Sequence, residues 1–347
     1  MGEYEWAMSS AVSHWLVVLS DPQRVRDLPP RALSIESLRR LLDLARRHGV
    51  LPAVLMNLRR LARSDEPGRV FAAQDQHTAQ EQLLAAEESL RASIGFCLLL
   101  RLQLQKVSAA MAQAGIPMIV LKGPDFADRL YAPSLRLFTD LDLLIGADAM
   151  DAAAGQLLNL GYRETQAPMK YADGYGERTF APPQPGGNVE LHWNLVNSPT
   201  IRRGVSVRLE DLQLQDHSQA AWQRAATPAS QLVIACVHAA ASHSFDRLGP
   251  LWDIVQIVRA SEPLDDNYLR HAVRATGAGL AVATALDLAA RTLNEPRCAE
   301  LMARLGLRGR WPAQLAITPG VVLRRHAWTD SFRRQIFRAM LKKGGRK

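Results

Sequence analysis

Two aspartates stand two residues apart in a short apolar segment, and this pattern constrains the fold more than any other feature of the sequence. The segment spans residues 138–146. If it is a β-strand, Asp140 and Asp142 share one face while Leu141 and Leu143 face a hydrophobic core. Aspartate forms strands poorly, and two like charges on one face repel each other. The segment is therefore either an edge strand with solvated charges or a strand whose carboxylates meet a cation.

The residues on either side of this segment predict a small α/β core. Residues 116–121 form an apolar run between glycines, typical of a buried strand, although its periodicity does not exclude a helix. Pro124 suits the first turn of a helix. A further helix is expected at 148–160, and a hairpin at 176–181 and 188–193.

Helical patterns dominate the rest of the chain. Ser34 is suited to cap a helix, and a long helix is expected to end near residue 114. Apolar helices are predicted at 229–241, 251–260 and 264–292. We therefore predict four parts: a helical N-terminal region at 1–114, an α/β core at 115–200, a helical C-terminal region at 201–320 and a basic tail at 321–347.

The basic tail accounts for the net charge of +8. From residue 321 to 347 the chain holds nine Lys or Arg and a single acidic residue, Asp330, so residues 1–320 are formally neutral. A basic surface on the body of the protein, as an extended nucleic-acid site requires, is not indicated. We expect the tail to be a solvated, partly frayed terminus, with binding to phosphates, an acidic partner or anionic lipid as the alternative.

The cysteine pattern and the hydropathy favour a cytoplasmic protein. Cys97, Cys236 and Cys298 are far apart and lack the close spacing of a zinc site, so buried thiols in a reducing compartment are expected. Acidic residues precede the short apolar stretch at 15–19, where a signal peptide would carry positive charge. No apolar run reaches membrane-spanning length.

Two further segments support a cation site beside the aspartates. Lys122 and Gly123 follow the predicted strand at 116–121, where a glycine lets backbone approach a ligand and a lysine can meet phosphate. In the hairpin, Glu190 and His192 alternate with apolar residues, so Glu190 could join the two aspartates from a neighbouring strand. Carboxylates are ligands that Mg²⁺ prefers, with its other positions left to water and phosphates. A solvent-facing lysine at a strand end is the alternative for Lys122.

The segment Val120–Gly146 resembles the uncharacterised nucleotidyltransferase family of the DNA polymerase β-like nucleotidyltransferase superfamily. Members of that family show Leu-Lys-Gly, then a Tyr and an Arg, then a strand with Asp-x-Asp. The resemblance continues through Leu160-Gly161-Tyr162 and Glu190–Trp193, and less specifically through 238–254, so that it covers about residues 80–260. The matching residues of this chain are Leu121-Lys122-Gly123, Tyr131, Arg136, Asp140 and Asp142.

The resemblance implies transfer of a nucleoside monophosphate from a nucleoside triphosphate to an acceptor, with release of pyrophosphate. Two Mg²⁺ or Mn²⁺ ions are expected, with Asp140, Asp142 and Glu190 as ligands and catalytic residues. Lys122, Gly123 and Arg136 would bind the nucleotide. The wider superfamily usually has a serine after the turn glycine, whereas this chain has Pro124, which changes how the triphosphate can be held.

Several other residues are candidates for accessory roles. Arg129 lies between the glycine turn and the aspartates and could meet phosphate, or could simply lie on a helix surface. His192 could orient a carboxylate or take the acceptor's proton, and a structural histidine is an equal alternative. His238 could lie near the substrate, or be core. Asp253, in an apolar stretch, is expected to pair with a basic group.

The acceptor is not defined by the sequence and could be a small molecule, a peptide or a protein. Two alternative functions follow from the same residues. A nucleotidyltransferase fold that has lost catalysis could bind a peptide or protein, which the altered glycine turn weakly favours. A toxin-like enzyme that modifies tRNA is the other, with the basic tail in contact with the nucleic acid.

Overall fold

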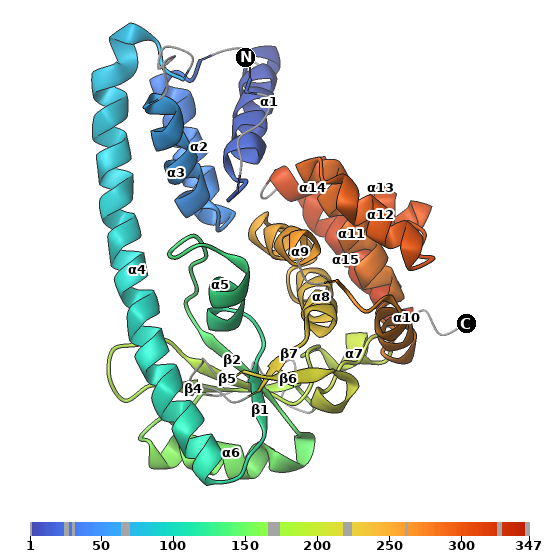
Figure 1. Cartoon of the computed structure of the whole chain (residues 1–347). Helices are drawn as coiled ribbons and strands as arrows, with labels where there is room; N and C mark the ends of the chain where they lie inside the picture. The colour runs from blue at the N-terminus through green and yellow to red at the C-terminus, as the bar shows by residue number, and fades with distance from the viewer. Residues whose placement is uncertain are drawn as a thin grey trace.

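A small mixed sheet carries the predicted core, and helices form most of the rest of the protein (Figure 1). The computed structural model describes residues 2–23, 28–29, 32–63, 70–165, 174–217, 224–260, 263–324 and 328–343. The predicted fold class, a small mixed α/β sheet with helical regions before and after it, is confirmed.

The sheet has five strands in the order β1-β2-β5-β4-β3. Strands β2 and β5 pair in parallel, and the other neighbours pair antiparallel. The expected hairpin is confirmed, because β4 and β5 pair antiparallel across residues 182–188. The bounds are β1 Met118–Val120, β2 Leu141–Ile145, β3 Arg163–Glu164, β4 Glu177–Ala181 and β5 Val189–His192. Strand β2 is shorter than predicted, and Asp140 lies just before it.

The two faces of the sheet belong to two hydrophobic clusters. Leu141, Leu143 and Val189 lie in one cluster with apolar side chains of α4 (Gln76–Gln113) and α6 (Met150–Asn159). Leu144, on the opposite face of β2, lies in the other cluster with residues of the C-terminal helices. Because side chains alternate along a strand, Asp142 falls on the Leu144 face. The sheet is thus covered on both sides, and Asp142 is buried between the sheet and the elements that cover this face.

The N-terminal region consists of helices, as predicted. Ser34 caps α2 through a hydrogen bond from the Ser37 N–H, and the buried residues of α2 lie on one face. Helix α4 runs along one side of the molecule from the α1–α3 helices to the sheet (Figure 1). The bounds are α1 Gly2–Leu19, α2 Ile35–Arg47, α3 Leu51–Ala62 and, after β1, α5 Pro124–Leu130.

After β5, the described part of the chain is mostly helical, with one two-stranded sheet. The single helix predicted at 264–292 is wrong: the chain forms two helices that break at Gly277, where φ is +71°. A Cβ at this position would overlap the carbonyl oxygen of Gly204, so only glycine fits the break. The elements are α7 Pro199–Arg202, β6 Leu214–Asp216, β7 Arg224–Ala226, α8 Pro228–Val237, a π-helical turn η6 His238–Ser242, α9 Gly249–Arg259, α10 Asp266–Ala275, α11 Gly279–Leu293, α12 Pro296–Arg304, α13 Trp311–Ala316 and α14 Pro319–Leu323.

The expectation of a frayed basic tail is wrong for Trp328–Lys343, which form helix α15. Phe337 and Leu341 are buried in the main core, and the ring of Phe337 lies 5.5 Å from that of Phe245. Arg334 donates a hydrogen bond to the Val321 carbonyl. Apolar residues at helical spacing outweigh the basic composition of this segment. Residues 344–347 lie outside the described part of the chain.

Two further expectations concern the whole chain. All three cysteines are free and buried, as predicted. Among the helices of the described residues, none combines the length and the apolar character that crossing a bilayer requires.

Replacing Phe337 with alanine should lower the free energy of unfolding by about 3–5 kcal/mol, because the change leaves a cavity in the core. Urea unfolding measures this loss. Phe332 on the same helix is 59% exposed and is the matched control, with an expected change within about 0.5 kcal/mol. Equal effects of the two substitutions would contradict the packing of α15.

Candidate active site

The parallel pairing of β2 and β5 brings three polar side chains together. The register places Asp142 opposite Glu190 and Leu144 opposite His192. One ligand atom from each of Asp142, Glu190 and His192 lies within 4.8 Å of the others. Glu190 was predicted to join the aspartates from a neighbouring strand. The structure brings Glu190 on β5 next to Asp142 on β2.

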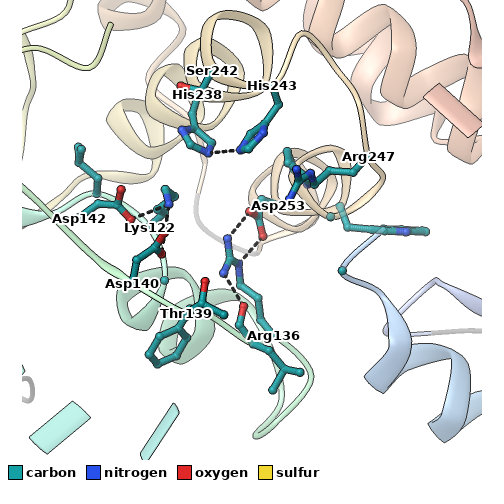
Figure 2. Close-up of a pocket in the computed structure, with 18 of the residues that line it drawn as sticks. Lys122, Arg136, Thr139, Asp140, Asp142, His238, Ser242, His243, Arg247 and Asp253 are labelled. Atoms are coloured by element: carbon teal, nitrogen blue, oxygen red, sulfur yellow. Dashed lines mark hydrogen bonds and ion pairs between the residues drawn. The ribbon is translucent and has the colours of Figure 1, made fainter. Parts of the chain in front are cut away.

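Lys122 lies over this group at the end of β1. Its Nζ is 2.6 Å from Asp142 Oδ2 and 3.6 Å from Asp140 Oδ1, so the ammonium bridges the two aspartates (Figure 2). Gly123 follows with φ +56°, a conformation that favours glycine, and this turn leads directly into α5. The lysine is therefore not the solvent-facing residue of the alternative reading: its side chain is 16% exposed.

His192 lies next to the carboxylates of both Asp142 and Glu190. Its Nε2 lies 3.3 Å from Asp142 Oδ1 and 3.6 Å from Glu190 Oε2, while Nδ1 lies 3.2 Å from Asn197 Oδ1. Glu177 Oε2 is 3.9 Å from the same Nδ1. The His192 ring is therefore in contact with polar groups at both of its nitrogens.

Burial and neighbouring charges shift the pKa values of Asp142, Asp140 and His192. Burial alone would raise the pKa of Asp142, but Lys122 and His192 outweigh burial and hold it below its ordinary value. Burial and the neighbouring Asp142 charge raise the pKa of Asp140. Burial opposes the charged form of His192, yet its contacts with Asp142 and Glu190 raise its pKa to about 10. The site is a set of closely spaced charges that neutralise one another.

This group lines a cavity of about 360 Å³. The cavity wall includes Ser20 and the turn at His48–Val50 from the N-terminal region, Tyr131 and residues 135–140, and residues of η6 and α9. The volume lies at the lower end of the range of small-molecule sites. Residues from all three predicted regions thus surround one cavity.

Arg136 and Asp253 form one side of the cavity. The guanidinium donates from Nε and Nη2 to the two carboxylate oxygens, each at 2.8 Å, and the Tyr131 hydroxyl donates to the same carboxylate at 2.8 Å. The expectation that Asp253 pairs with a basic group is confirmed. Arg136, predicted to bind nucleotide, is engaged with this carboxylate and fixes the loop before β2 to α9.

Two histidines, His238 and His243, line the cavity wall opposite the carboxylates. Of these two, His238 was proposed from the sequence as a residue near the substrate. His238 and His243 approach through their Nε2 atoms at 3.0 Å, and the π-helical turn η6 between them makes this possible at a spacing of five (Figure 2). Asp246 Oδ1 lies 3.6 Å from His243 Nδ1, and Arg247 donates to both oxygens of Asp246. In the sequence, the spacing of three residues between His243 and Asp246 could have indicated that these two side chains meet.

These two histidines are neutral at physiological pH. Burial and the nearby Lys122 charge lower the pKa of His238 well below its ordinary value. Burial and Arg247 lower the pKa of His243 to about 4. Asp246 favours a proton on His243 Nδ1, which leaves His243 Nε2 to accept the hydrogen bond from His238 Nε2–H.

Arg129 lies away from this cavity. Its guanidinium donates to the Ala226 carbonyl at 2.8 Å and faces Asp125 at 3.4 Å, which ties α5 to β7. Arg129 was predicted to lie either beside phosphate or on a helix surface. Instead, its side chain is 15% exposed and is held between α5 and β7.

The residues present fit a divalent cation. Carboxylate oxygens are the ligands that Mg²⁺ and Mn²⁺ prefer, and Asp142 and Glu190 each bring one carboxylate oxygen within 4.8 Å of the other. Asp142 Oδ2 is buried and, apart from its ion pair with Lys122, accepts no hydrogen bond among the described residues. Only one such ligand group occurs in the described part of the chain, and Asp140 stands beside it.

The family model for uncharacterised nucleotidyltransferases matches residues 36–294. This match covers more than half of the chain, so the chain belongs to that family. The matched range includes the sheet, Lys122, the carboxylates and the histidine pair, but excludes α15. Among the curated proteins, none matches the chain.

Protonation of His243 should couple stability to pH. Its folded pKa of about 4 lies below the unfolded value of about 6.5, so the unfolded state binds the proton first as pH falls. The free energy of unfolding should therefore decrease between pH 6.5 and 4, by about 2 kcal/mol at pH 5 from this group. Urea unfolding at pH 7.5 and 5 should show that His243→Gln loses this share of the decrease.

The exposed His77 provides the control for this measurement. His77→Gln should keep the full pH dependence of the parent protein. If His243→Gln keeps it as well, His243 is not buried in its neutral form.

Proposed function

We propose that this member of the uncharacterised nucleotidyltransferase family transfers a nucleoside monophosphate from a nucleoside triphosphate to an acceptor, with release of pyrophosphate. The observation that carries this proposal is the meeting of Asp142 and Glu190, from two parallel strands, beneath Lys122 in a single cavity. A divalent cation bound there would neutralise the triphosphate and polarise the phosphorus that is attacked.

We assign the residues of the acidic wall to metal and phosphate binding. The cation is held by Asp140, Asp142 and Glu190. His192 orients the carboxylates of Asp142 and Glu190 through its Nε2. Lys122 and the Gly123 turn contact the phosphates, because the lysine already faces the cavity and glycine lets the backbone approach closely. Catalysis by this arrangement depends on positioning and on charge neutralisation rather than on a protein nucleophile.

We assign the opposite wall to the acceptor. His238 and His243 line this wall as a neutral pair joined through their Nε2 atoms, and Asp246 lies beside the His243 ring, so the pair can hydrogen-bond the acceptor and position it. Arg136 has a positioning role, because its Nε and Nη2 donate to Asp253 and its Nη1 donates to the Leu137 carbonyl. The acceptor that receives the nucleoside monophosphate is a small molecule, a peptide or a protein.

Incubation with each nucleoside triphosphate, radiolabelled at the α-phosphate, together with Mg²⁺ or Mn²⁺ and cell extract, tests the activity and identifies the acceptor. Label should appear on a discrete acceptor, and only with a divalent cation present. Asp142→Asn should lower this transfer by about 100-fold or more, because the amide loses the ligand charge while keeping the shape.

Asp128→Asn is the matched control. Asp128 pairs with Arg101 on the protein surface and does not line the cavity, so its variant should retain full transfer. Transfer by Asp142→Asn within twofold of the parent protein, with both variants folded by circular dichroism, would contradict the proposed function.

A further inference from the structure

Lys122 occupies the position from which a cation would reach Asp142. Its Nζ lies 2.6 Å from Oδ2, and the other oxygen, Oδ1, faces His192 Nε2 at 3.3 Å. Both oxygens of Asp142 therefore already have a cationic or proton-donating neighbour. The carboxylate is 4% exposed, so little of its surface is left for a further ligand.

A metal ion and the Lys122 ammonium cannot share Oδ2. A divalent cation sits about 2.1 Å from a carboxylate oxygen, and repulsion between two cations on one oxygen is strong in a buried site. The same ammonium is 3.6 Å from Asp140 Oδ1, so it also screens the second predicted ligand. Binding of the metal ion thus requires Lys122 to move.

Lys122 has room to move toward the cavity. Its side chain lines the cavity from the β1–α5 turn, and its four-carbon stem is flexible. Without an anion there, the displaced ammonium would be a buried charge lacking a partner, which is unfavourable. Phosphate oxygens bound beside the metal would give it that partner.

We propose that Lys122 is a resident counter-cation that makes binding of the metal ion depend on binding of a triphosphate. Metal alone has to compete with the ammonium, whereas metal and triphosphate together replace one ion pair by another. This coupling is reciprocal, so each ligand raises the affinity for the other. The inference rests on the proposed function, because it takes Asp142 as a metal ligand.

Two binding measurements on the purified full chain test the coupling. The first is the dissociation constant of Mn²⁺ alone, followed through the electron paramagnetic resonance signal of free Mn²⁺. The second is the dissociation constant of the preformed complex of Mn²⁺ with inorganic tripolyphosphate, followed by calorimetry. Tripolyphosphate has no base, so the result does not depend on which nucleotide is the substrate.

Lys122→Met, which keeps the length and removes the charge, should shift the two constants in opposite directions. It should bind Mn²⁺ alone at least tenfold more tightly than the parent protein, and the Mn²⁺–tripolyphosphate complex at least tenfold more weakly. Lys122→Gln repeats the test if the methionine variant does not fold. Lys106→Met, on the exposed side of α4, is the control and should change neither constant.

The outcomes separate this inference from the proposed function. If the parent protein binds the Mn²⁺–tripolyphosphate complex but Lys122→Met binds Mn²⁺ alone no more tightly, the lysine does not compete with the metal and the inference fails. If neither protein binds Mn²⁺ in any form, the metal site itself is absent, and the proposed function fails with it.

Discussion

The parallel register of β2 and β5 is the constraint on which the site depends. Leu141 and Leu143 on β2 and Val189 and Leu191 on β5 pack against α4 and α6, and alternation then turns Asp142 and Glu190 to the other side. A slip of one residue would bury a carboxylate in that apolar cluster and expose leucines to the cavity. Hydrophobic packing on one face of the sheet thus fixes the position of the acids on the other.

The acids on that face are stable because other parts of the chain supply compensating charge and close the cavity. Lys122 and His192 neutralise the carboxylates directly, and Arg136 joins the loop before β2 to Asp253 on α9. Arg259, in α9, donates to both oxygens of Asp21, which holds the segment after α1 against α9. Helix α15, outside the range matched by the family, packs on η6, which carries His238, and so supports the wall opposite the acids.

Local patterns in the sequence were sufficient for the elements whose periodicity is clear and for the side chains that alternate along strands. The hairpin with Glu190 and the Ser34 cap depend on such patterns, and both have their expected form. The Asp-x-Asp segment forms the expected strand only from Leu141, with Asp140 just before it. Features set by tertiary contacts were not predictable. The break at Gly277 follows from the close approach of Gly204, and the docking of α15 follows from a pocket for Phe337. The meeting of His238 with His243 needs a π-helical turn, which no periodicity indicates.

The central claim is that Asp142 and Glu190 share a divalent cation beside a triphosphate. Crystals grown with Mn²⁺ and tripolyphosphate, measured at the manganese absorption edge, test it most directly. The account predicts an anomalous peak at bonding distance from both carboxylates, with Lys122 turned from Asp142 toward the phosphates. Ordered tripolyphosphate in the cavity without a manganese peak at these two carboxylates would contradict it.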